Sequence, residues 1–72
     1  MIACKDIKGN EVYVTTCNDI GDNVGGLYCQ VYADTNLEIE IDYFAISKHI
    51  AKSQIENVIK DIIENEDYSK VF

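Results

Sequence analysis

The sequence contains no arginine, proline or tryptophan, and its six lysines are outnumbered by thirteen aspartates and glutamates. The 72 residues therefore carry a formal net charge of −7. A protein that binds nucleic acid directly needs basic side chains to neutralise phosphates, so this composition excludes a basic nucleic-acid binder. No run of about 18 apolar residues is present, which excludes a membrane-spanning helix. Residues 1–6 have neither the basic start nor the apolar stretch of a signal peptide, and we expect a cytoplasmic protein.

The sequence also lacks paired metal ligands. Its three cysteines, Cys4, Cys17 and Cys29, are widely spaced and form no Cys-x-x-Cys pair. Because structural zinc sites usually contain close ligand pairs, we do not expect these thiols and His49 to bind zinc. An odd number of cysteines without a secretory signal also argues against a disulfide framework. We expect three small apolar side chains in strands, in a reducing compartment.

Catalytic motifs are missing as well. The single histidine, His49, lies between lysines and has no local partner for acid–base chemistry. Carboxylates are plentiful, but no segment isolates one of them in an apolar pocket, which is what raises the pKa of a general acid. We therefore predict no catalytic residue, no cofactor and no metal, and a protein that is not an enzyme.

The residues that are present indicate one folded domain over residues 1–72, because 47% are hydrophobic and 26% charged. Two β-type segments, 2–7 and 11–17, flank Lys8-Gly9-Asn10, a sequence typical of a hairpin loop. A three-residue loop predicts one buried apolar row, made of Ile2, Cys4, Val12 and Val14. Residues 18–26 are predicted to form a glycine-rich loop, in which Asp19, Asp22 and Asn23 are a weak match to a calcium site.

A second hairpin is predicted from segments 27–33 and 37–43, closed by residues 34–36. Pairing Ala33 with Leu37 makes both segments alternate, with apolar side chains on one face. That face would hold Val31 opposite Ile39 and Cys29 opposite Ile41. The other face would hold the pairs Tyr32 with Glu38, Gln30 with Glu40, and Tyr28 with Asp42.

The last third of the chain changes to a helical period. Apolar residues recur three and four positions apart over 44–66, at Ile46, Ile50, Ile55, Val58, Ile59, Ile62 and Ile63. Either one helix begins near Ala45 or two helices join at Ser53, which has capping-box spacing to Glu56. The tail 67–72 would fold back on the core or meet a partner. The predicted fold is therefore α+β: a four-stranded antiparallel sheet from two β-hairpins (1–43) with a C-terminal amphipathic helix packed on one face.

Charge is unevenly distributed along the chain. Residues 11–42 contain seven carboxylates and no lysine, so the whole net charge resides on the predicted sheet and its loops. In the segment 37–43, the predicted register lines up Glu38, Glu40 and Asp42 about 6.6–6.8 Å apart on one face. Such a row resembles a nucleic-acid backbone and would be attracted to the basic groove of a nucleic-acid-binding protein. The alternative is that the row only keeps an exposed sheet soluble.

In its size, its α+β composition and its acidic segment 11–42, the chain resembles small single-domain inhibitors encoded by phages and mobile elements, including anti-CRISPR proteins. The resemblance implies an inhibitor that occupies a nucleic-acid groove of a host defence protein. The residues expected to contact this basic partner are Tyr28, Tyr32, Asp34, Glu38, Glu40 and Asp42, with the tyrosines as rigid anchors.

Two other functions stay open. The first is a homodimer or larger homo-oligomer that sequesters a small signalling nucleotide between subunits, using Gly25, Gly26, Lys48, His49 and Lys52. The second is a structural or assembly subunit that uses its tyrosine-rich sheet and its C-terminal tail.

Overall fold

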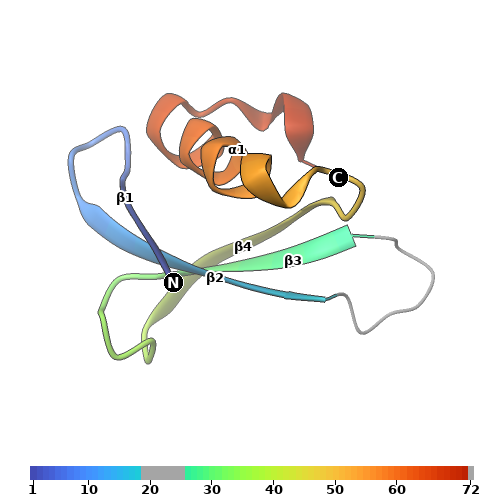
Figure 1. Cartoon of the computed structure of the whole chain (residues 1–72). Coiled ribbons are helices and arrows are strands. Elements are labelled where there is room, and N and C mark those ends of the chain that lie inside the picture. Colours follow the sequence, from blue (N-terminus) through green and yellow to red (C-terminus); the bar gives the residue numbers. More distant parts are fainter. Residues whose placement is uncertain (19–25, 72) are drawn as a thin grey trace.

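The computed structural model describes residues 1–18 and 26–71 (Figure 1). Four antiparallel strands follow one another across a single sheet: β1 (Ile2–Lys5), β2 (Glu11–Asn18), β3 (Gly26–Tyr32) and β4 (Glu40–Ser47). Helix α1 (Lys52–Asn65) packs on one face of this sheet, and a short 3-10 turn, η1 (Tyr68–Lys70), follows it. The predicted α+β fold is confirmed. The helix of the described chain is too short and too polar to cross a membrane.

The first hairpin has the predicted buried face, but its first strand is shorter than predicted. Ile2 pairs with Val14 and Cys4 with Val12, so the expected apolar row is formed. However, β1 ends at Lys5, and residues 6–10 form the loop. The Asp6 carboxylate stabilises this loop by accepting the backbone N–H groups of Lys8 at 2.9 Å and Asn10 at 2.8 Å.

The second hairpin differs from the predicted register. Cys29 pairs with Phe44 rather than with Ile41, and Val31 pairs with Asp42. Because side chains alternate along a strand, this displacement by an odd number of positions exchanges the two faces of β4 from Asp42 onward. Ile39 and Ile41, which were predicted to be buried, are 58% and 54% exposed. A bulge between Val31 and Tyr32 adds a further irregularity at this end of the hairpin.

Two features explain the observed register: a long loop stabilised by Asp34, and a core that gains the side chain of Ile46. The Asp34 carboxylate accepts the backbone N–H of Ile39 at 2.9 Å and that of Glu38 at 3.1 Å, and Leu37 has a positive φ of 58°. The chain therefore needs residues 33–39 to turn. In return, β4 extends to Ser47 and brings Ile46 into the core, where it is fully buried. Residues 44–47, predicted as helical, are consequently part of a strand.

The C-terminal segment contains one α-helix rather than two. Ser47 accepts the backbone N–H groups of His49 and Ile50 in a turn before the helix. The N-cap of α1 is Ala51, which has no side-chain hydrogen bond, so the predicted capping role of Ser53 is wrong. The Ala51 carbonyl accepts the backbone N–H of Gln54 at 2.8 Å, but its methyl side chain has no acceptor, and the helix start therefore lacks a side-chain cap.

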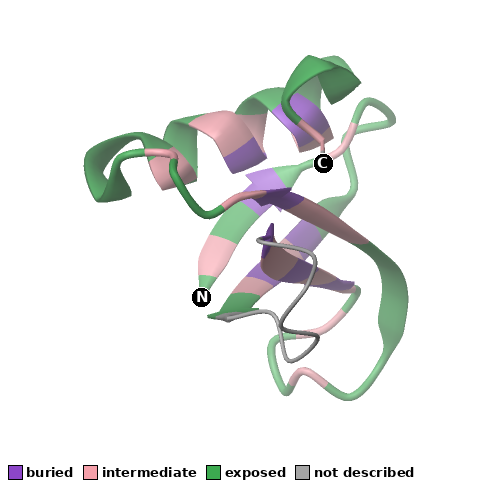
Figure 2. Cartoon of the chain, turned by 90° about the vertical axis from the view of Figure 1, so that its right-hand side faces the viewer, coloured by how far each residue is buried: buried purple, intermediate pink, exposed green. Residues whose placement is uncertain are grey.

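The core lies between α1 and the helix side of the sheet (Figure 2). Helix residues Ile59 and Ile62 pack there against five strand side chains on β1, β2 and β3 and one on β4: Cys4, Val12, Val14, Cys29, Val31 and Ile46. The tail folds back on the core: Val71 forms an antiparallel bridge to Ile46 and packs against the buried residues. Phe72 lies outside the described residues.

Candidate partner-binding surface

The sheet face turned away from α1 is rich in tyrosine. We call it the tyrosine face and define it by the side chains that alternate with buried ones along β2, β3 and β4: Tyr13, Thr15, Cys17, Tyr28, Gln30, Tyr32 and Tyr43. The register places Tyr13 opposite Tyr32 and Gln30 opposite Tyr43. Among the described residues, no helix or strand covers this face (Figure 1). The fold thus presents four phenol side chains on one uncovered side of the sheet.

Contacts within the tyrosine face hold its side chains in place. The rings of Tyr28 and Tyr43 stack with centroids 5.8 Å apart and planes 16° from parallel. Thr15 Oγ1 donates to Gln30 Oε1 at 3.3 Å across the strands. The partner of such a face would meet side chains that have already lost much of their conformational freedom.

Two of the tyrosine hydroxyls are held in the neutral, donor-competent form. The hydroxyl of Tyr13 donates to a Glu11 carboxylate oxygen at 3.2 Å, and this hydrogen bond raises the pKa of Tyr13. Partial burial raises the pKa of Tyr28, and the nearby Tyr43 and Glu40 contribute to the same rise. Both phenols are therefore protonated at neutral pH; the Tyr28 hydroxyl can donate a hydrogen bond to a partner, whereas the proton of Tyr13 is already donated to Glu11.

The structure does not form the predicted row of three carboxylates. Glu38 lies in the loop before β4, Glu40 pairs with Tyr32 on the tyrosine face, and Asp42 pairs with Val31 on the helix side. The exchanged faces of β4 and the bulge beside Val31 separate these groups. Regular spacing along one strand face was therefore a wrong prediction, although all three side chains are exposed.

Acidic side chains nevertheless border the tyrosine face. Glu40 and Glu11 lie at its ends on the same side of the sheet, and Glu38 is exposed in the adjoining loop, at the end of the β3–β4 hairpin that projects beyond the helix layer (Figure 1). Lys5, opposite Glu11, is the cation that the described strands place on this side of the sheet. Asp34 lies in the same loop, but its carboxylate is occupied by backbone N–H groups and acts mainly as a loop support.

Sequence reasoning identified some of these residues and missed others. Tyr28, Tyr32 and Glu40 share the tyrosine face as predicted, whereas Asp42 lies on the other side. Tyr13 was missed. Its alternation with the buried Val12 and Val14 in the first hairpin was a sufficient signal for its place on this face. Tyr43 depended on the register of the second hairpin, which the sequence pattern did not identify.

The basic side chains of the nucleotide-binding alternative lie apart from this surface. Lys48, His49 and Lys52 are exposed around the turn between β4 and α1. Gly25 and the calcium candidates Asp19, Asp22 and Asn23 lie outside the described residues. Within residues 1–18 and 26–71, no three histidine, cysteine, aspartate or glutamate side chains are placed to hold a metal ion.

Comparison with known proteins finds no matching family model, no similar curated protein and no similar solved structure. The function must therefore be argued from the chemistry of the tyrosine face and its acidic border.

Proposed function

We propose that this chain is a non-enzymatic, cytoplasmic binding protein that occupies a basic, nucleic-acid-binding surface of a partner, as an inhibitor of phage or mobile-element origin would do. The observation that supports this proposal is the uncovered tyrosine face bordered by Glu11, Glu38 and Glu40. Tyrosine offers a large contact area at a low entropic cost, and it is enriched where binding energy is concentrated.

Charge supplies the second part of the argument. The segment 33–42 contains four carboxylates and no lysine. A surface with this potential attracts a basic groove before contact, and it suppresses binding to acidic proteins. Because Glu38, Glu40 and Asp42 are not regularly spaced, recognition would depend on the summed negative potential rather than on the spacing of phosphates.

The proposal is tested with a partner captured from bacterial lysate on the immobilised protein and eluted with a salt gradient. The captured protein is then loaded with labelled DNA or RNA, and displacement by this chain is followed by fluorescence anisotropy. We expect displacement that weakens as salt rises, because exposed charge contacts are screened. The double variant Glu38→Lys with Glu40→Lys should weaken displacement by about tenfold or more, since like charges would then face each other.

The control is Glu56→Lys with Asp61→Lys, which makes the same change in net charge at two exposed positions of α1. It should change displacement less than threefold. Equal losses in both double variants would show a general charge effect and contradict the proposed surface. A captured partner that binds this chain but keeps its nucleic acid would contradict the proposed function.

A further inference from the structure

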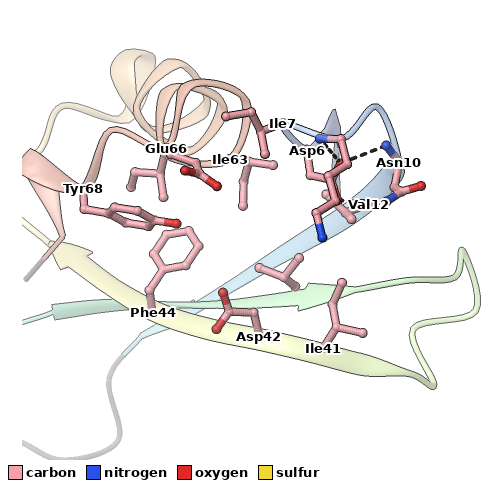
Figure 3. A pocket seen from close by; sticks show the side chains of 13 residues that line it. Asp6, Ile7, Asn10, Val12, Ile41, Asp42, Phe44, Ile63, Glu66 and Tyr68 are labelled. Carbon is pink, nitrogen blue, oxygen red and sulfur yellow. Dashed lines mark hydrogen bonds between the residues drawn. The ribbon is translucent and has the colours of Figure 1, made fainter.

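A cleft of about 320 Å³ opens on the helix side of the sheet (Figure 3). Three parts of the chain form it: the β1–β2 loop, the middle of the β3–β4 hairpin, and the C-terminal end of α1 with Tyr68. Its floor is apolar and includes Val31, Phe44, Ile62 and Ile63. This volume lies at the lower end of the range for pockets that bind small groups.

The border of this cleft is acidic. Asp6, Asp42 and Glu66 line it, against a single lysine, Lys8. The carboxylates of Glu66 and Asp42 extend into the cleft from its helix wall and its sheet wall (Figure 3). Among the described residues, neither of them forms an ion pair. Backbone N–H groups of Asn10 and Lys8 lower the pKa of Asp6, so its negative charge is also retained.

The end of helix α1 adds to this negative potential. The C-terminus of a helix carries a partial negative charge, which basic residues in the last turn commonly offset. The last turn of α1 contains no basic residue. The C-cap, Glu66, has a left-handed backbone with φ 51°, and it places a further carboxylate at this end of the helix. A cation in the cleft would therefore be stabilised by the helix end and by Glu66 together.

We propose that this cleft receives an arginine side chain of a partner protein. The aliphatic stem would pack on Phe44 and Ile63, as long basic side chains do on apolar surfaces. The planar guanidinium has donors in several directions and can reach carboxylates from two walls, here Asp42 and Glu66. This site lies on the opposite side of the sheet from the tyrosine face, and it goes beyond the function proposed above.

The test is a titration of the isotope-labelled protein with a capped tripeptide, acetyl-Leu-Arg-Leu-amide, followed by amide chemical shifts in NMR spectra. We expect saturable shifts at the residues that line the cleft. The matched peptide with citrulline, which has nearly the same shape but no charge, should bind at least tenfold more weakly. The double variant Asp42→Asn with Glu66→Gln should weaken binding of the arginine peptide at least tenfold.

The control variant is Asp61→Asn with Glu64→Gln, which removes two charges from the last turns of the same helix without touching the cleft. It should bind the peptide within about threefold of the unchanged protein, and circular dichroism confirms that each variant is folded. Equal binding of the citrulline peptide, shifts confined to the tyrosine face, or full binding by the Asp42 and Glu66 variant would overturn the proposal. Tighter binding of free spermidine than of the tripeptide would overturn the assignment to a protein side chain. Because this titration needs no partner, its failure is distinct from a failure of the Glu38 and Glu40 experiment.

Discussion

At the scale of single residues, the three cysteines differ in their access to water. Cys4 and Cys29 are buried in the core, whereas Cys17 is exposed on the tyrosine face. Burial raises the pKa of Cys4, and it raises the pKa of Cys29 to about 12. Since the thiolate is the reactive form, the two buried thiols are protected both by their neighbours and by protonation.

We therefore expect one maleimide per chain at pH 7, attached to Cys17, and three after unfolding in denaturant. Intact mass before and after denaturation, with peptide mapping, gives the number and the position. A Cys17→Ser variant should not react in the native state. Rapid native labelling of Cys29 would contradict the packing of β3 against the helix.

Asp6 provides a prediction of pH dependence. Its hydrogen bonds from Asn10 and Lys8 lower its pKa below the usual value of 3.8 in the folded state. A depressed folded-state pKa means that the stabilisation is complete above the unfolded pKa and is lost as pH falls through the folded one. The melting temperature of Asp6→Asn should thus be lower than that of the unchanged protein at pH 7, and the difference should shrink below about pH 4.

Thermal melts at several pH values measure this difference. Asp61→Asn is the control, because the Asp61 carboxylate accepts only a long contact of 3.4 Å from the Asn65 side chain. A difference between Asp6→Asn and the unchanged protein that grows as pH falls would contradict the assigned role.

At the scale of elements, the helix start offers a simple gain in stability. The N-cap Ala51 has an extended ψ of 139° but no side-chain oxygen. Ala51→Ser would supply an acceptor for the free N–H groups of the first turn, and we expect an increase of about 1 kcal/mol in the free energy of unfolding. Urea denaturation measures it. Ser53→Ala should change the free energy of unfolding by less than about 0.5 kcal/mol, because Ser53 is not the cap. A loss of about 1 kcal/mol would instead show that Ser53 caps the helix and would contradict the assignment of Ala51.

The sequence predicts the type and order of the strands well, because the period of apolar residues is local information. The register of the second hairpin is different, because two pairings of β4 both give alternating faces. The choice between them depends on Ile46, which the helical spacing to Ile50 had assigned to the wrong element. The packing of Ile46 in the same core as Ile59, together with the loop that Asp34 supports, favours the observed register.

The candidate surface could be predicted only in part for the same reason. Tyr28 and Tyr32 follow from the alternation of β3 alone, and their shared face was predictable. The positions of Glu40, Asp42 and Tyr43 depend on the register and on the bulge beside Val31, which no local pattern shows. The cleft was not predictable at all, because its walls come from three segments that are distant in the sequence.

At the scale of the whole molecule, the most acidic segment lies at a projecting end of the structure. The molecule measures 33 × 24 × 18 Å, and the end of the β3–β4 hairpin projects away from the helix (Figure 1). Segment 33–42 has no lysine, whereas the six lysines lie on β1, the β1–β2 loop and the residues from Lys48 onward. This asymmetry would orient the molecule hairpin first as it approaches a basic partner.

The open edge of β4 has a consequence for self-association of the chain. Val71 covers the edge at Ile46, but no described segment pairs with it from Glu40 to Phe44, where Ile41 and Tyr43 are exposed. Unpaired edges of this kind are templates for fibril growth, and charged side chains and bulges are the usual protection against it.

Glu40→Gln with Asp42→Asn should therefore form thioflavin-positive aggregates sooner than the unchanged protein at neutral pH. The variant Glu56→Gln with Glu64→Gln loses the same charge from the helix and should not; equal aggregation of both would assign the effect to net charge alone. The carboxylates of β4 would then repel identical neighbours as well as attract a basic partner, and one pair of side chains would keep the chain monodisperse until that partner arrives.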